Sequence, residues 1–330
     1  MSRDNQTCSQ EIRSLLHSAN QPLILSHIRP DGDAVASVLA MGLALQADGK
    51  KVQMVFPEGI SAKFKFLTGS DQIRAQAEPG YDLVIALDCA DKNRMGADFA
   101  DFNVDINIDH HITNDNFARQ NMVLPEEPAT AAILAQFLPQ WGFPITPNIA
   151  DALLTGILTD TIGFRTSNVS ANSLRLAANL IENGANLTDL YEKSLVSQTY
   201  SASQLWGFAL SRLEKKGRLA WTSITLEDRK KAGYAGRDDA DLTNILSAIE
   251  NIDVSVLFNE KDNSIIKVSW RSNATVNVSV IAQCFGGGGH PPAAGAEITG
   301  SLQEVQNMVL EITDSYLKQN KSKGENDYGK

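Results

Sequence analysis

The sequence predicts an α/β protein: a mainly parallel sheet covered by helices in the first half, and a second, smaller α/β unit after it. Short apolar runs alternate with amphipathic helical segments up to Glu182, which is the pattern of βαβ units. After a polar stretch, a new series of strand-like runs begins near Arg218. The 330-residue chain is long enough for two cores.

The elements of the first unit follow from short apolar runs and from longer helical patterns. The expected strands are Pro22–Ser26, Lys51–Phe56, Leu83–Leu87 and Val104–Ile108. Their nearly continuous apolar character is typical of strands that are buried on both faces. The expected helices are Ala34–Ala47, Ala129–Leu138, Asn148–Thr159 and Ala171–Glu182. A glycine stop signal, Gly184, ends the last of these helices.

The second unit repeats this mixture on a smaller scale. Its expected strands are Leu219–Leu226, Val254–Phe258 and Ile265–Trp270, and its expected helices are Asp241–Glu250, Val276–Cys284 and Leu302–Lys318. We therefore expect a first domain at 1–186, a polar helical connector at 187–211 and a second domain at 212–320, with a cleft between the two domains. The charged segment 321–330 is expected to be a disordered tail.

Composition narrows the range of partners and compartments. The net charge is −10, and dense runs of Lys and Arg are missing from the sequence, which argues against duplex DNA as a partner. An acidic chain can still bind small phosphorylated molecules when metals neutralise its carboxylates. No apolar run is long enough to span a bilayer, and the polar N-terminus does not resemble a signal peptide. Three widely spaced cysteines fit a reducing compartment, so we expect a cytoplasmic location.

Four of the five histidines lie in three short motifs. These motifs are His27-Ile-Arg-Pro-Asp31-Gly-Asp33, Asp109-His110-His111, and the glycine run that ends at His290. Histidine and aspartate together suit divalent metals such as manganese. Taken alone, Asp-Gly-Asp is more often a turn with a capping aspartate, but a histidine at the end of the preceding strand favours a metal.

The polar residues His27, Asp88 and Asp109 each follow an expected strand. Ligands of open α/β sheets bind outside the carboxyl ends of the strands, so we expect these side chains in one crevice. Asp160 ends a very apolar helix, where a carboxylate opposes the helix dipole unless a cation is near. An exposed carboxylate at a frayed helix end is the alternative. Arg165 is a candidate phosphate contact or an ordinary surface arginine.

The glycine run, Gly286 to Gly289, is either a flexible loop or a place where backbone N–H groups approach an anion closely. It lacks the Lys-Ser/Thr ending of a nucleotide P-loop. The candidate substrate contacts here are Gly287, Gly288, Gly289 and His290. Arg271, at the end of a strand, is a second candidate clamp because its guanidinium binds phosphate bidentately.

These motifs, in this order, resemble the DHH family of phosphoesterases, which is named for the triad Asp109-His110-His111. The C-terminal Gly286–Gly295 segment resembles the signature of the DHH-associated substrate-binding domain. Within the family, the chain is most similar to the bifunctional nano-RNases that also act as phosphatases on 3′-phosphoadenosine 5′-phosphate. The resemblance covers essentially the whole chain, and the ordered set of motifs is more specific than each motif alone.

The resemblance implies two Mn²⁺ ions, with Mg²⁺ or Co²⁺ as substitutes. One ion would be held by His27, Asp31 and Asp88, and the other by Asp33, Asp88, His110 and Asp160. Asp88 would bridge them at roughly 3.5–4 Å, so that a shared water, acidified to hydroxide, attacks phosphorus in line. His111 would contact the phosphate or assist the leaving group, and Asp109 would fix a histidine tautomer.

The leading hypothesis is therefore a manganese-dependent enzyme that releases 5′-mononucleotides from short oligonucleotides, or removes the 3′-phosphate of 3′-phosphoadenosine 5′-phosphate, or does both. Alternatives are a phosphodiesterase of cyclic or linear dinucleotides and a manganese inorganic pyrophosphatase. A non-catalytic nucleotide sensor is a further alternative, but it would lack a metal ligand, and all the implied ligands are present. Family analogy also suggests a homodimer.

Overall fold

The computed structural model describes residues 3–99, 101–261, 264–273 and 276–324. The chain divides into two compact units, Met1–Ser197 and Gln198–Lys330. The division falls inside the expected connector 187–211. Helix α6 (Leu187–Tyr191) buries Leu190 in the core of the first unit, whereas α7 (Tyr200–Leu210) buries Leu205 in a core of the second.

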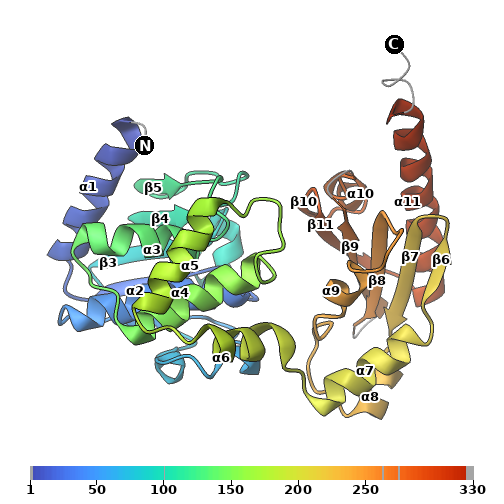
Figure 1. The fold of residues 1–330 in the computed structure, drawn as a ribbon, viewed down its shortest axis with the longest axis horizontal. Helices are drawn as coiled ribbons and strands as arrows, with labels where there is room; N and C mark the ends of the chain where they lie inside the picture. The colour runs from blue at the N-terminus through green and yellow to red at the C-terminus, as the bar shows by residue number, and fades with distance from the viewer. Residues whose placement is uncertain (1–2, 100, 262–263, 274–275, 325–330) are drawn as a thin grey trace. The chain divides into compact units, whose positions relative to one another are not determined.

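The first unit contains a five-stranded sheet in which all the strands are parallel (Figure 1). Its order is β2-β1-β3-β4-β5. The strands are β1 (Pro22–Leu25), β2 (Gln53–Val55), β3 (Leu83–Leu87), β4 (Ile106–Asp109) and β5 (Gln120–Val123). The parallel sheet confirms the predicted fold class. Strand β5 was not expected, because its Gln and Asn residues break the apolar pattern and it is only partly buried.

Helices cover one face of this sheet, and shorter segments cover the other. The helices are α1 (Arg3–Ser18), α2 (Gly32–Ala47), α3 (Thr130–Trp141), α4 (Pro147–Asp160) and α5 (Ala171–Glu182). Successive strand residues point to opposite faces, so Ile24 and Ile85 pack in the core formed with the helices, while Leu23 and Val84 pack in a separate cluster. That cluster includes Met95 and residues of the 3₁₀ segments η3 (Lys92–Met95) and η4 (Ala97–Phe99).

The strand order places a topological switch between β1 and β3. From β1 the chain moves outwards to β2, and then returns to the other side of β1 to form β3. The connections therefore diverge at the carboxyl ends of β1 and β3, which leaves a place for a ligand there. His27 and Asp88 lie just after these two strands.

The second unit contains a mixed six-stranded sheet of order β10-β11-β9-β8-β7-β6. The strands are β6 (Glu214–Lys216), β7 (Leu219–Ile224), β8 (Val254–Glu260), β9 (Ile265–Ser272), β10 (Gly288–His290) and β11 (Ala293–Thr299). The helices beside it are α8 (Leu226–Ala232), α9 (Leu242–Leu246), α10 (Ser279–Gln283) and α11 (Leu302–Gly324). Only the β7–β8 pairing is parallel among the named strands. Trp270 is fully buried in this core.

Several expected boundaries in the second unit were wrong. The strand expected to reach Leu226 ends at Ile224, because Thr225 caps α8 in a capping box with Asp228. The last two glycines of the run form a short strand with His290, β10, that pairs with β11; glycine is depleted in strands, so the pattern predicted no strand. Residues 321–324 of the expected tail continue α11. The rest of that tail, 325–330, lies outside the described residues.

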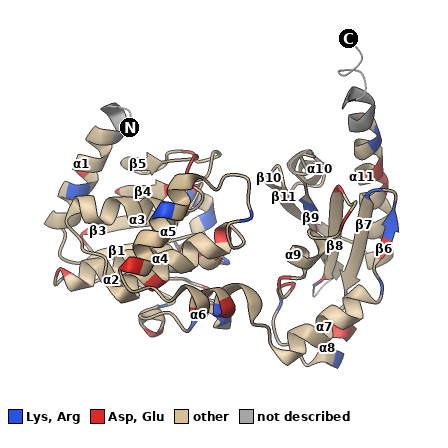
Figure 2. Ribbon diagram, viewed as in Figure 1, with Lys and Arg blue, Asp and Glu red and all other residues tan. Residues whose placement is uncertain are grey.

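Charge is spread over both units. Figure 2 shows Lys and Arg dispersed over many elements, with the clearest basic segment at β6, which contains Lys215 and Lys216. In the described residues, no helix combines the length and the apolar character that a membrane crossing requires.

Candidate active site

The loop after β1 turns directly into α2. Asp31 is the N-cap of α2, and its Oδ1 accepts hydrogen bonds from the backbone N–H groups of Asp33 and Ala34, both at 3.1 Å. A Cβ at Gly32 would lie 2.4 Å from Oγ1 of Thr159 near the end of α4. Glycine therefore allows the Asp-Gly-Asp turn to pack against α4, close to Asp160.

Asp33 is buried and joins α2 to the start of α3. Its Oδ2 accepts from the backbone N–H of Thr130 at 2.6 Å, and its Oδ1 accepts from that of Ala131 at 3.0 Å. The N-cap residue of α3, Ala129, has no side chain to do this. Burial and the negative charge of Asp88 raise the pKa of Asp33 to about 7. The Asp33 carboxylate thus caps α3 from a neighbouring helix.

Asp88 lies at the centre of the cluster, directly after β3, with 1% of its surface exposed. Oδ2 lies 3.8 Å from Nε2 of His27, and Oδ1 lies 3.6 Å from Nε2 of His110 and 3.7 Å from Nδ1 of His111. Thr130 donates its hydroxyl to Oδ1 at 3.1 Å. Burial acts to raise the pKa of Asp88, but the nearby imidazoles of His27, His110 and His111 outweigh it and lower this pKa.

Two histidines direct Nε2 into the cluster. Nδ1 of His27 lies 2.8 Å from the carbonyl oxygen of Ile28, and Nδ1 of His110 lies 3.3 Å from that of Glu127. An imidazole that donates Nδ1–H to a carbonyl keeps an unprotonated Nε2, which is the tautomer that binds a metal. Nε2 of His110 also lies 3.4 Å from Oδ2 of Asp160.

His111 is oriented differently. Its Nδ1 lies 2.7 Å from Oδ1 of Asp109, a fully buried carboxylate. Asp109 therefore orients His111 and not His110, whose ring lies at 61° to that of His111. Asn114 donates to the other oxygen of Asp109, at 2.6 Å.

Asp160 completes the cluster at the end of α4, with 30% of its side chain exposed. Burial and the negative charges of Asp33, Asp31 and Asp88 raise the pKa of Asp160 well above its usual range. Crowded carboxylates of this kind are unfavourable together unless a cation offsets their charge. Carboxylate oxygens combined with imidazole nitrogens suit manganese and related divalent cations, so the residues present fit such ions.

Two of the close groupings correspond to the two ligand sets that the family resemblance implies, except that Asp88 belongs only to the first of these two groupings. The ligand atoms of His27, Asp31 and Asp88 lie within 4.8 Å of one another, and so do those of Asp33, His110 and Asp160. A third grouping, Asp88 with His110 and His111, shares members with both, and its near His111 nitrogen already faces Asp109. The structure thus brings all six predicted ligands together, and their coordination of metal stays a prediction.

The family follows from comparison with known proteins. The N-terminal domain model of the DHH family matches residues 22–157, and the DHHA1 domain model matches residues 230–319. The bifunctional oligoribonuclease and PAP phosphatase NrnA of Thermus thermophilus is 36% identical over 313 residues, which cover 93% of each chain. This chain belongs to the DHH family of phosphoesterases.

Two further relatives extend this likeness. The NrnA of Bacillus subtilis is 24% identical over 87% of this chain and 91% of its own. The crystal structure of an exopolyphosphatase-related protein from Bacteroides fragilis superposes with a TM-score of 0.87 at 26% identity, covering 96% of this chain and 97% of that one. Both units of this DHH phosphoesterase therefore have counterparts in a single solved chain.

The predicted substrate contacts occupy several places in the two units. Arg165 is exposed in the turn after α4, where Ile162 and Phe164 have positive φ angles of 49° and 66°. Arg271 lies on β9 and donates to the carbonyl of its neighbour Trp270 at 3.2 Å. The side chain of His290 lies outside the described part of the chain. Substrate contact by these residues stays a prediction.

The glycines of the DHHA1 region have a packing role that the sequence did not reveal. A Cβ at Gly287 would lie 2.2 Å from the carbonyl oxygen of Gly295, and one at Gly289 would lie 2.5 Å from that of Ala293. Glycine is therefore required for this segment to approach β11. Gly288 differs, because a Cβ there would meet nothing within 4 Å.

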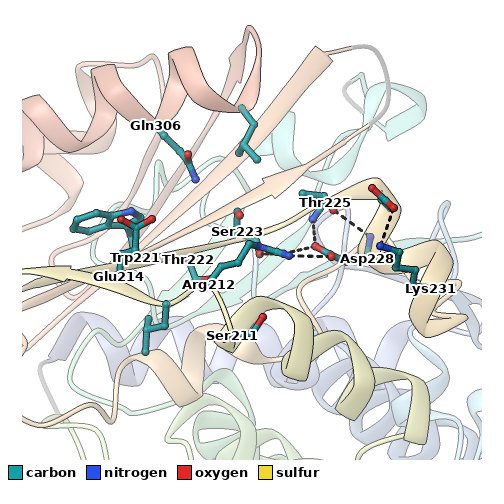
Figure 3. A pocket seen from close by; sticks show the side chains of 13 residues that line it. Ser211, Arg212, Glu214, Trp221, Thr222, Ser223, Thr225, Asp228, Lys231 and Gln306 are labelled. Carbon is teal, nitrogen blue, oxygen red and sulfur yellow. Dashed lines mark hydrogen bonds and ion pairs between the residues drawn. The ribbon is translucent and has the colours of Figure 1, made fainter.

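A cavity of about 520 Å³ lies elsewhere in the second unit, beside β6 and β7 (Figure 3). These strands form the edge of the sheet opposite β10. Its charged groups are largely paired with one another: Arg212 with Asp228, and Lys231 with Glu227. None of the residues predicted for the site lines this cavity.

The sequence interpretation missed two residues of the site, Thr130 and Asn114. Thr130 begins α3, and it contributes its N–H to Asp33 and its hydroxyl to Asp88. Asn114 follows the triad in the sequence and contacts Asp109. A threonine at the start of a helix and an asparagine in a turn are both common, so neither position carried a signal by itself.

Proposed function

We propose that this phosphoesterase hydrolyses short oligonucleotides to 5′-mononucleotides and removes the 3′-phosphate of 3′-phosphoadenosine 5′-phosphate, with two Mn²⁺ ions bound in the first unit. Whole-chain similarity to an oligoribonuclease and PAP phosphatase supports the substrate class. The observation that carries the proposal is the position of Asp88. This carboxylate lies within reach of His27 and Asp31 through one grouping and of His110 through another.

The chain's own residues would divide the cations as follows. His27, Asp31 and Asp88 would hold one ion, and Asp33, Asp88, His110 and Asp160 would hold the other. Bound there, the cations would supply charge neutralisation for the phosphoryl oxygens and would lower the pKa of a water molecule. The raised pKa of Asp160 and of Asp33 fits a site that is completed by positive charge.

Hydrolysis adds the oxygen of water to phosphorus, breaks the bond from phosphorus to the leaving oxygen and delivers a proton to that oxygen. His111, held at Nδ1 by Asp109, would contact the phosphate or supply this proton. We propose Arg165, Arg271, His290 and the glycines Gly287, Gly288 and Gly289 as contacts for the rest of the substrate. The lack of dense Lys and Arg runs in the sequence and a net charge of −10 favour a short substrate over a long nucleic acid.

A substrate panel tests the proposal. With Mn²⁺ added, release of phosphate or nucleotide is measured from 3′-phosphoadenosine 5′-phosphate, a linear dinucleotide, cyclic dinucleotides and pyrophosphate. We expect turnover of the first two, and its loss in Asp88→Ala. Asp189→Ala, which removes an exposed carboxylate paired with Lys193, is the matched control and should retain turnover. Turnover of pyrophosphate or cyclic dinucleotides alone would contradict the substrate class, and full activity of Asp88→Ala would contradict the mechanism.

A further inference from the structure

A network of side-chain amides lies behind the candidate active site. The side-chain NH₂ group of Asn114 faces three acceptors: Oδ2 of Asp109 at 2.6 Å, Oδ1 of Asn107 at 2.8 Å and the carbonyl oxygen of Cys89 at 3.1 Å. Asp109 and Asn107 belong to β4, and Cys89 comes two residues after β3. One amide therefore joins the carboxyl ends of two strands that both deliver residues to the site.

Asn107 holds this network in place. It is fully buried, and its own NH₂ group donates to the carbonyls of Ala86 at 3.4 Å and of Cys89 at 3.2 Å, on either side of Asp88. Its Oδ1 accepts from Asn114. The position of the Asn114 amide is thus set by groups that belong to the sheet.

The carboxylate of Asp109 depends on Asn114 for one of its oxygens. Oδ1 accepts from the backbone N–H of His110 at 2.8 Å and faces Nδ1 of His111 at 2.7 Å, whereas the hydrogen bond to Oδ2 comes from Asn114. A buried carboxylate oxygen that loses its donor keeps the cost of desolvation. Without Asn114, the Asp109 carboxylate lowers its free energy by rotating so that Oδ2 finds another donor. This rotation also moves Oδ1, the oxygen that faces Nδ1 of His111.

We propose that Asn114 is a positioning residue: by holding Oδ2 of Asp109, it fixes the ring orientation and the tautomer of His111. This positioning role depends on the proposed function in one respect, which is that His111 contacts the reacting phosphate. Changes to the partners that orient active-site ligands typically cost about 10- to 100-fold in activity. We expect Asn114→Ala to lower kcat by about that factor and to leave KM unchanged.

A purely structural role for Asn114 would have different consequences. Oδ1 of Asn114 accepts a hydrogen bond from the backbone N–H of Asn116 at 2.7 Å, and the backbone N–H of Asn114 donates to the carbonyl of His111 at 3.1 Å. Asn114 therefore also closes a turn. Loss of the turn alone would lower stability, and its effect on activity would not depend on whether residue 111 carries an imidazole.

A double-mutant cycle separates these two roles. kcat and KM are measured at saturating Mn²⁺ for the native chain, Asn114→Ala, His111→Ala and the double variant. Asn183→Ala, which removes an exposed amide that donates to the carbonyl of Asn179, is the control and should behave as the native chain. The proposal predicts that Asn114→Ala costs nothing further once His111 is absent. An equal fold loss of kcat in both backgrounds would overturn it.

A second readout needs no turnover. Nitrogen-15 NMR of histidine-labelled, metal-free protein reports which ring nitrogen of His111 carries the proton, with the signal assigned from His111→Ala. We expect Nδ1 protonation in the native chain and a mixture of tautomers in Asn114→Ala. Unchanged His111 ring signals would overturn the positioning role. Absence of turnover in the native chain would instead contradict the proposed substrates and leave this result standing.

Discussion

Gly156 of α4 packs where three helices meet at the candidate active site. A Cβ at this position would lie 2.5 Å from Cβ of Ala131 on α3, 2.6 Å from Oδ1 of Asp33 and 3.1 Å from Cβ of Ala36 on α2. The first two distances are too short for real contacts, and the third is unusually tight. Gly156→Ala must therefore move a helix or displace the Asp33 carboxylate from the two backbone N–H groups that donate hydrogen bonds to it.

The magnitude follows from three contributions. Overpacking a tight core costs about 1–3 kcal/mol, and a buried hydrogen bond lost at Asp33 costs about 1–3 kcal/mol. The higher helix propensity of alanine returns about 1 kcal/mol. We therefore expect Gly156→Ala to lower the free energy of unfolding by about 1–5 kcal/mol. Because Asp33 is a proposed ligand, stabilisation by Mn²⁺ should weaken as well.

Urea denaturation with and without Mn²⁺ measures both effects. Gly207→Ala is the matched control, because Gly207 lies inside α7 and a Cβ there would meet nothing within 4 Å. The control should gain up to about 1 kcal/mol from helix propensity. If Gly156→Ala stabilises the chain as Gly207→Ala does, then tight packing of α4 against Asp33 is refuted.

Three further predictions concern the site and the glycine strand. Thr130→Val removes the hydroxyl that donates to Asp88 and should weaken Mn²⁺ binding by about 10- to 100-fold in calorimetry; native affinity would count against this contact. Burial and the charge of Asp88 raise the pKa of Asp33 from 3.8 to about 7, so the folded metal-free chain binds more protons than the unfolded chain in that window. Thermal melts should show its stability falling, and the stabilisation by Mn²⁺ rising, as the pH increases through the window; the opposite trend would contradict this sign. Gly287→Ala should lower the free energy of unfolding by about 1–3 kcal/mol, because its Cβ would collide with the backbone of β11. Gly288→Ala, whose Cβ would meet nothing, should keep native stability and raise KM. Equal melting temperatures for the two variants would contradict the packing role of Gly287.

Much of the first unit could be predicted because its signals are local. Buried parallel strands read as short apolar runs, and polar residues directly after them mark the ligand edge of the sheet. His27, Asp88 and Asp109 stand out for this reason. Strand β5 could not be found in this way, because its sequence has no apolar strand pattern. It is a strand because its backbone pairs with β4.

The supporting contacts of the site depend on tertiary structure. Asp33 caps α3 from α2, and the two helices are far apart in the sequence. Nothing near Asp33 indicates that role, just as nothing near Gly156 indicates the proximity of Asp33. The glycine run shows the converse case: its pattern left open a flexible loop or close approach to an anion, and the structure shows Gly287 and Gly289 packed closely against β11, while contact with an anion stays a prediction.

The central claim is that two divalent cations lie on either side of Asp88. Anomalous diffraction from a crystal soaked in Mn²⁺ tests it most directly. We predict two peaks, one among His27, Asp31 and Asp88, and the other among Asp33, His110 and Asp160, with Asp88 between them. A single peak, or peaks away from these residues, would contradict the account.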